Sequence, residues 1–424
     1  MPHRLRDIPA RLGPFTLAFA LSAAIPAFAN NGLNLIGFGA QSVGMGGADL
    51  AVETGASALN INPAAVPREG QAFENSAGPA VGIDNYHTDA NGKKVSIESP
   101  FALVGSAGYT RALGRVTLGI GLFAQGGSGT AFNNIATPFG TVDDIGAQIG
   151  VMRITPGVAW HASERLSLGV SVPLNIALAK QDVYPDTSTA TFSGYAIRDA
   201  FSFSPSIKAG ALFRVNDRVS IGATYSSKTK LEFRNAEMEV NYTAQGFGYV
   251  TYDETKLEGI SLPQQLGIGI ALRPTPQLTL ALDVDWLDWS SAVERSTLTA
   301  KNPNSSLAPQ TIQASSDLNW KDQVVFAIGA AYDVSDRLTL RAGYNYGRSP
   351  LPESTLSPLL APIGEHTLTL GMGYRMQGGW KLDGALEWQV AEEVTYTNPI
   401  SLTGNPSSLQ IGYIAIHLTA AKVW

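Results

Sequence analysis

Residues 201–214 read Phe-Ser-Phe-Ser-Pro-Ser-Ile-Lys-Ala-Gly-Ala-Leu-Phe-Arg, and this stretch decides the fold class. Every odd-numbered position is apolar, whereas serine, lysine, glycine or arginine fills most of the even positions. Side chains of a strand point alternately to its two faces, so the pattern predicts a strand with one apolar and one polar face. Alternation over about ten residues is typical of a strand that crosses a bilayer as part of a barrel.

The same alternation recurs along the chain, and its apolar faces end in aromatic residues. The aromatic residues at the short-turn ends of these strands are Tyr109, Trp160, Phe213, Tyr332 and Tyr374. Rings gathered at one level form the girdle that marks a membrane interface. A soluble sandwich gives no reason for such a girdle, so we predict an all-β fold, a transmembrane antiparallel β-barrel.

The composition excludes two other classes of protein. Only 15% of the 424 residues are charged, whereas about 25% is usual in soluble globular proteins. After the first 29 residues there is no apolar run of about 18 to 20 residues, which a helical membrane protein would need. The net charge of −6 repels the phosphates of nucleic acid, so we predict no nucleic-acid partner.

About fourteen strands are expected, each bounded to within about two to four residues. Their ranges are 71–83, 100–111, 115–127, 150–161, 165–180, 200–214, 218–232, 261–273, 277–289, 321–333, 337–347, 364–375, 380–394 and 409–424. Tight turns alternate with long connections, and in such barrels the turns face the periplasm while the loops face outside. The last strand ends on Trp424 in phase with apolar residues, which resembles the signal read by the outer-membrane barrel assembly machinery.

The N-terminus divides into an export signal and a second, glycine-rich segment. Residues 1–29 combine three arginines, an apolar stretch and Ala27-Phe28-Ala29, so we predict a signal peptide with Asn30 as the first mature residue. Residues 30–70 neither alternate nor look strongly helical. A lumen of about fourteen strands is too wide for strand side chains to fill, so we expect this segment to be a hatch that plugs the barrel of residues 71–424. A phosphate-binding G-x-G-x-x-G loop fails here, because Ser42 and Asp49 replace the third glycine.

Three stretches carry a resemblance to a known family. They are Asn31-Gly-Leu-Asn-Leu-Ile-Gly-Phe-Gly-Ala, Gly44-Met-Gly-Gly-Ala and the segment that ends in Asn62-Pro63-Ala64. With the hairpins that follow, they resemble the FadL/TodX family of outer-membrane transporters for hydrophobic compounds. The resemblance implies a hatch-gated barrel in the outer membrane of a Gram-negative bacterium, which takes up long-chain fatty acids passively and releases them laterally, without a cofactor.

The resemblance also implies three groups of site residues. For the gate, Asn62, Pro63 and Ala64 would face an inward kink of the third strand, where Gly126 and Gly127 favour a bend. For capture by the external loops 181–199 and 233–260, the candidates are Tyr184, Phe192, Tyr195, Phe247 and Tyr249. For the deeper ligand pocket, the apolar candidates are Leu33, Leu35, Ile36 and Phe38, next to the mature N-terminus at Asn30.

The alternation of side chains along the strands also predicts charged residues that face the lumen. Arg153 and Lys208 face inward and could pair with a fatty-acid carboxylate, as could Arg341. The acidic residues on the inward faces are Asp283, Asp285, Asp383 and Glu387. Mixed charges can also pair with one another, and that structural interpretation is favoured for the group as a whole.

Enzyme activity is not expected. His161 and His417 face inward without a recognisable serine partner, and no G-x-S-x-G motif is present. Asp283-Val-Asp285 lacks the further ligands of a calcium loop, so no metal is predicted. Three alternatives stay open: uptake of aromatic hydrocarbons, a general porin and an adhesin. The predicted partners are a hydrophobic ligand, outer-membrane lipid with lipopolysaccharide, and the assembly machinery, around a monomer.

Overall fold

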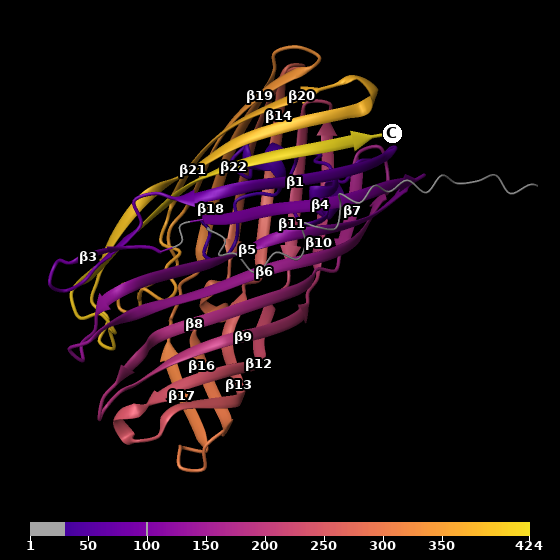
Figure 1. The fold of residues 1–424 in the computed structure, drawn as a ribbon. Helices are drawn as coiled ribbons and strands as arrows, with labels where there is room; N and C mark the ends of the chain where they lie inside the picture. The colour runs from indigo at the N-terminus through magenta and orange to yellow at the C-terminus, as the bar shows by residue number, and fades with distance from the viewer. Residues whose placement is uncertain (1–29, 99–100) are drawn as a thin grey trace, which may run out of the picture.

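The computed structural model describes residues 30–98 and 101–424, and most of them form one closed antiparallel sheet (Figure 1). The predicted signal peptide, residues 1–29, lies outside the described residues. The first and last strands pair with each other from Ala72↔Val423 to Gly82↔Tyr413, which closes the barrel. No helix among the described residues is long and apolar enough to cross a membrane.

The strands run in chain order as β1 (Gln71–Gly82), β2 (Tyr86–Thr88), β3 (Lys94–Ser96), β4 (Phe101–Leu113), β5 (Val116–Ala136), β6 (Val142–His161), β7 (Leu166–Ser171), β8 (Leu174–Ser188), β9 (Ser193–Pro205), β10 (Lys208–Asn216), β11 (Val219–Ser226), β12 (Thr229–Tyr242), β13 (Gly248–Leu262), β14 (Gln265–Thr275), β15 (Leu278–Leu287), β16 (Arg295–Pro303), β17 (Thr311–Asp317), β18 (Gln323–Asp333), β19 (Leu338–Gly347), β20 (His366–Arg375), β21 (Trp380–Tyr396) and β22 (Ser407–Val423). The helices are α1 (Gly39–Val43), α2 (Trp289–Ala292), η1 (Ala56–Leu59), η2 (Pro63–Ala65), η3 (Thr243–Gln245) and η4 (Gln377–Gly379).

These segments make a closed barrel of fourteen crossings, which confirms the predicted strand number. Four crossings consist of two segments each, because a short break separates β7 from β8, β9 from β10, β11 from β12, and β13 from β14. The short hairpin of β2 and β3 belongs to the first long connection and pairs with β22. Each predicted strand range overlaps one of the crossings.

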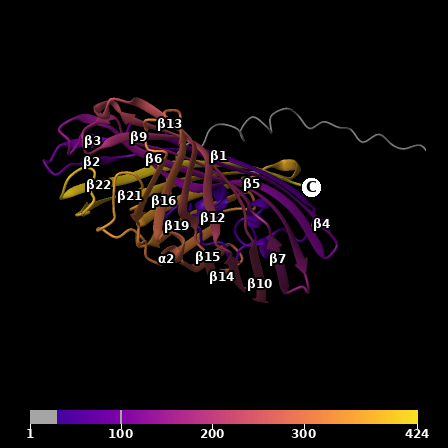
Figure 2. The same ribbon diagram turned by 90° about the horizontal axis from the view of Figure 1, so that it is seen from below.

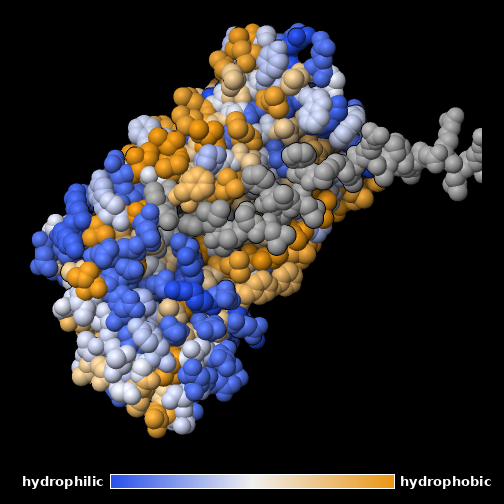
Figure 3. Space-filling view, viewed as in Figure 1, coloured by the Kyte–Doolittle hydropathy of each residue, from blue (hydrophilic) through white to orange (hydrophobic). Residues whose placement is uncertain are grey.

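The alternating pattern places the apolar faces outside. Phe203 and Ile207 are 57% and 54% exposed, whereas their sequence neighbours Ser202 and Lys208 are buried. Figure 3 shows hydrophobic residues gathered over the strand-rich part of the surface and hydrophilic ones over the end with the long hairpins. A barrel in a bilayer needs such an apolar outer band around a polar interior.

Two long connections were predicted as loops, and the structure corrects this. Residues 181–199 belong largely to β8 and β9, and residues 233–260 to β12 and β13. Strand pairing therefore continues beyond the apolar band, and β16 and β17 extend it further. The outer part of β12 alternates in the opposite sense, because Met238 and Val240 are buried and Glu239 between them is exposed. A search for apolar outward faces therefore does not find it.

Residues 30–66 lie inside the ring of strands, as the indigo segment in Figures 1 and 2 shows. Most of them are buried. The backbone N–H of Ala40 donates to Thr419 Oγ1 at 2.8 Å, and the N–H groups of Asp49 and Leu50 donate to Asp283 Oδ2 at 2.6 and 2.8 Å. A segment without long helices or strands thus satisfies its backbone through inward-facing side chains of the barrel.

Candidate functional site

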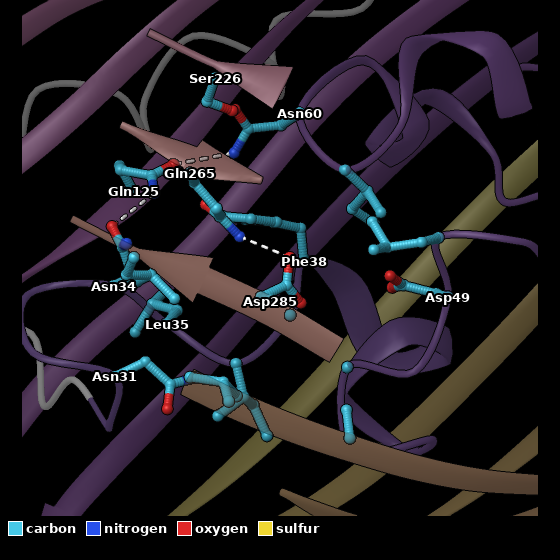
Figure 4. A pocket seen from close by; sticks show the side chains of 18 of the residues that line it. Asn31, Asn34, Leu35, Phe38, Asp49, Asn60, Gln125, Ser226, Gln265 and Asp285 are labelled. Atoms are coloured by element: carbon cyan, nitrogen blue, oxygen red, sulfur yellow. Dashed lines mark hydrogen bonds between the residues drawn. The ribbon is translucent and has the colours of Figure 1, made fainter. Parts of the chain in front are cut away.

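A cavity of about 80 Å³ lies between the hatch and the barrel wall (Figure 4). Its hatch side includes Leu35, Ile36 and Phe38, and its barrel side includes Arg153 and Lys208, all five of them predicted pocket residues. The other two predicted pocket residues do not line it. Leu33 packs in a buried cluster with Trp289, and Asn30 lies in a separate polar cluster near Glu387.

Arg153 is held in the cavity wall by neutral partners. Its guanidinium donates to Asn175 Oδ1 at 2.5 Å, to Gln125 Oε1 at 2.7 Å and to Asn60 Oδ1 at 3.3 Å. Gln125 also donates to Asn34 Oδ1 at 3.1 Å, so this network ties the hatch to β5 (Figure 4). The positive charge of Arg153 therefore has amide partners but no carboxylate within ion-pair distance among the described residues.

Lys208 lines the same cavity and is only 6% exposed. Its ammonium makes no hydrogen bond and no ion pair within the described part of the chain. The acidic residues that act on it from a greater distance are Asp49 and Asp285. Asp285 is engaged by Gln265, whose Nε2 donates to Asp285 Oδ1 at 2.9 Å. The cavity thus borders a buried cation that is free to meet an anionic group.

Other lumen charges pair among themselves. Arg341 lies 2.9 Å from Asp383, and Lys381 lies 3.2 Å from the same carboxylate. Glu387 contacts His417 at 2.8 Å. The self-pairing expected from strand parity therefore holds for Arg341 and Asp383, but it does not extend to Arg153 or Lys208.

The Asn62-Pro63-Ala64 motif docks on the barrel wall. Asn62 Oδ1 accepts from the Ala64 N–H at 3.0 Å and caps η2, with Pro63 in the first turn. Asn62 Nδ2 donates to Leu50 O at 2.7 Å and to Ala211 O at 3.1 Å. The motif therefore contacts β6, β7 and β10. Ala64 also shares a buried cluster with Phe123 of β5, the strand that the resemblance had placed opposite the motif.

The third strand, β5, does bend inward at Gly126 and Gly127. It pairs with β4 only from Leu113↔Val116 to Ser106↔Phe123, and its ladder with β6 shifts register between Ala124 and Gly126. Gly126 forms a bridge with Asn34 of the hatch instead. The φ angles of Gly126 and Gly127 are 145° and 150°, in a region that side chains other than glycine rarely adopt. The wall between β4 and β5 consequently lacks ladder pairing beyond Phe123.

The predicted capture residues divide into two groups. Tyr184 is fully buried, and Phe192 stacks on Phe139 with ring centroids 4.2 Å apart and meets Tyr184 edge-on. Phe247 and Tyr249, in contrast, are exposed at the start of β13. Tyr195 belongs to the first group, because it is partly buried against the same cluster and its hydroxyl accepts from Gln181 Nε2 at 3.1 Å. The structure therefore does not bring the five residues into one groove.

The loop between β19 and β20 was not predicted to take part. Thr130 Oγ1 of β5 donates to the carbonyls of Pro358 and Leu359, Asn398 Nδ2 donates to Leu356 O at 3.1 Å, and Thr355 Oγ1 donates to Leu318 O at 2.7 Å. The loop thus spans the extracellular mouth from β5 to the far wall. Its run of leucine and proline, unusual for a solvated loop, was the available signal.

His161 was expected to lack a serine partner, and this expectation was wrong, because a serine lies within hydrogen-bond distance of its ring. His161 Nδ1 lies 2.9 Å from Ser167 Oγ, and Nε2 lies 3.1 Å from Thr117 Oγ1. Ser167 is fully buried, so no substrate ester reaches its hydroxyl. Among the described residues no group of three or more His, Asp and Glu could hold a metal ion.

A closed, apolar-banded barrel with an internal segment and a small cavity defines an outer-membrane channel with a plugged lumen. The chain matches the family model described as "Outer membrane protein transport protein (OMPP1/FadL/TodX)" over residues 19–411, and it belongs to that family. Members are outer-membrane barrels of Gram-negative bacteria that transport hydrophobic compounds.

Solved structures show the same fold at low identity. The toluene transporter TodX of Pseudomonas putida is 20% identical, with a TM-score of 0.77, and the toluene transporter TbuX of Ralstonia pickettii is 21% identical, with a TM-score of 0.73. A FadL homologue of Pseudomonas aeruginosa is 17% identical, with a TM-score of 0.72. Each match covers 92% of this chain and 99% of the other.

A curated relative adds a shorter match. It is an uncharacterised protein of Chlorobium limicola encoded upstream of a phosphoenolpyruvate carboxykinase gene, and it is 45% identical over 69 residues. The match covers 16% of this chain and 32% of that protein, so the chain spans about a third of the relative's length.

Proposed function

We propose that the protein takes up long-chain fatty acids passively and that Lys208 receives the ligand carboxylate. The observation that supports this ligand class is the buried ammonium of Lys208, which lines the cavity without an ionic partner among the described residues. A hydrogen bond between charged groups contributes about 1.5 to 3 kcal/mol, and each buried methylene adds about 0.8 kcal/mol. About ten methylenes alone would correspond to micromolar affinity.

The route needs movement of the hatch. A cavity of about 80 Å³ is smaller than the roughly 150 Å³ that accommodates a single benzene ring, so an alkyl chain cannot enter the closed state. Displacing Leu35 and Phe38 would enlarge it toward β5, where the ladder with β4 is missing. The ligand would then leave sideways through this gap into the membrane.

A second candidate is uptake of monoaromatic hydrocarbons. Two of the similar solved structures are toluene transporters, and Phe38 meets Phe123 edge-on at 5.7 Å beside the cavity. Such a ligand needs aromatic contacts and no cation. The two candidates therefore differ in whether Lys208 contributes to affinity.

The deciding experiment compares Lys208→Met with Lys230→Met, an exposed lysine on the outer side of β12. Equilibrium binding of a labelled C16 fatty acid to the purified barrel is measured, with toluene as competitor. We expect Lys208→Met to weaken fatty-acid binding by about 10- to 100-fold, and Lys230→Met to leave it unchanged. Displacement of the fatty acid by toluene, together with no effect of Lys208→Met, would favour the hydrocarbon. Absence of binding by either compound would favour the porin or adhesin.

A further inference from the structure

Asn30 lies deep in the lumen, in a polar cluster separate from the cavity. It is 2% exposed, and its Nδ2 donates to Thr367 Oγ1 at 2.6 Å and to Glu387 Oε1 at 3.2 Å. Its Oδ1 accepts from the hydroxyl of Tyr413. Three strands, β20, β21 and β22, thus fix one asparagine at the start of the described chain.

Glu387 is the acidic member of this cluster, and the imidazole of His417 is the one basic group that contacts it among the described residues. It is 3% exposed and has no lysine or arginine within ion-pair distance among the described residues. Its other partners are His417 Nε2 at 2.8 Å and the Tyr413 hydroxyl at 2.6 Å. By contrast, Asp383 four residues earlier on the same strand has both Arg341 and Lys381. Glu387 therefore lacks the permanently charged partner that Asp383 has, and a buried carboxylate gains from one.

The backbone nitrogen of Asn30 is a second group of this cluster that could become a positive partner. It is four bonds from Nδ2, the atom that already contacts Glu387. In an uncut chain this nitrogen is a neutral amide, whereas cleavage after Ala29 turns it into an ammonium.

We propose that the lumen contains a binding site for the mature chain's own α-ammonium, with Glu387 as its counter-ion. Thr367 and Tyr413 hold the side chain of Asn30 so that the new amine faces the carboxylate. Removal of the leader therefore completes the docking of the hatch, because only the cut chain supplies the charge. This site does not depend on which ligand the protein carries.

The sequence allows a selective readout of this amine. Residues 30–67 contain no lysine, so the tryptic peptide that ends at Arg68 carries the α-amine as its only amine. Barrels purified from outer membranes are treated with an N-hydroxysuccinimide acetate, and the labelled fraction of this peptide is followed by mass spectrometry from pH 6 to 10. The intact mass of the same sample identifies the first residue.

We expect the first residue to be Asn30, and its amine to react at least about tenfold more slowly in the folded barrel than after heat denaturation. Pairing with Glu387 favours the charged, unreactive form, so the rate should rise only well above pH 8, the ordinary pKa of an α-amine. Glu387→Gln should bring this rise down by about one pH unit, which is a tenfold faster reaction at pH 8. The control Glu393→Gln changes an exposed glutamate of the same strand and should have no effect.

Three results would overturn the proposal. One is a purified barrel that retains its leader. Another is equal labelling of the wild-type amine in the folded and unfolded states, a comparison that needs no variant. The third is an identical pH profile for Glu387→Gln and Glu393→Gln, with heat-modifiable folding intact in both, since burial alone would then explain the protection.

Discussion

Asp49 shows how one hatch residue can make docking depend on pH. Burial raises the pKa of this carboxyl to about 7 from 3.8, and the nearby Asp285 acts in the same direction. Ser42 and Lys208 act in the opposite direction but do not cancel the effect of burial. The docked hatch therefore binds a proton more tightly at Asp49 than a hydrated, displaced hatch does.

The sign of the pH effect follows from this shift. The raised pKa of Asp49 stabilises the docked hatch fully below about pH 4, and this stabilisation is lost as the pH rises through 7. Each unit of pKa shift corresponds to up to about 1.4 kcal/mol. We predict that hydrogen exchange of hatch amides, corrected for intrinsic rates, becomes faster between pH 5 and 8. Asp49→Asn should flatten this dependence, and Asp217→Asn in an exposed periplasmic turn should not. An unchanged slope in Asp49→Asn would contradict the assignment.

The inward positions of Arg153 and Lys208 could be predicted because strand parity has a period of two. The hydrogen-bond partners of Arg153 could not be predicted. Asn60 and Asn34, which complete the network of Arg153 and Gln125, belong to a hatch without periodicity. For the same reason the sequence placed Leu33 in the pocket, whereas contacts with Trp289 bury it elsewhere.

At the scale of elements, the bend of β5 depends on a residue without a Cβ. A Cβ on Gly126 would overlap the carbonyl of Leu33, and its φ of 145° adds strain. We predict that Gly126→Ala displaces residues 33–35 from β5, at a cost of about 1 to 3 kcal/mol. Faster hydrogen exchange in this segment and about tenfold weaker ligand binding would be the result.

Gly384→Ala is the matched control, because the nearest atom to a Cβ at that strand position is 3.7 Å away. Equal hydrogen exchange and equal ligand binding in the two alanine variants would show that the contact between β5 and the hatch is dispensable.

The loop between β19 and β20 leads to a second prediction at this scale. The chain has no cysteine, so Thr130→Cys together with Leu359→Cys creates a single pair that a short thiol cross-linker can join. These residues already meet, with Thr130 Oγ1 3.3 Å from Leu359 O. If ligands enter past this loop, cross-linking should reduce fatty-acid uptake by about tenfold or more, and cleaving a reducible linker should restore it.

Each single-cysteine variant, treated in the same way, serves as the control. Full uptake in the cross-linked double variant would show that ligands enter by another path.

Elements with strong periodicity were the ones that the sequence predicted well. All fourteen crossings overlap the predicted strands because lipid outside and a polar lumen inside impose alternation. Beyond the bilayer this constraint ends, so the outer parts of β12 and β13 and the hairpin of β16 and β17 were mistaken for loops. The loop across the mouth was missed for a different reason: its position is set by contacts distant in sequence.

For the molecule as a whole, two separate structures close the lumen. The loop between β19 and β20 spans the extracellular mouth, and the hatch fills the interior toward the periplasmic end. There Glu53 of the hatch pairs with Arg214 of β10. The barrel itself is closed by the ladder of β1 and β22, which involves no hatch residue. The barrel should therefore keep its fold when the hatch is removed.

We predict that a mature chain without residues 30–66 forms a heat-modifiable barrel whose single-channel conductance is clearly above that of the full chain. The lumen would lose the buried segment that now occupies it, and the cavity would lose the wall formed by Leu35, Ile36 and Phe38. Fatty-acid binding should therefore disappear in the same variant, although Lys208 is still present. Conductance equal to that of the full chain would instead identify a channel that is already open, as a porin requires, and the hatch would then have no role as a gate.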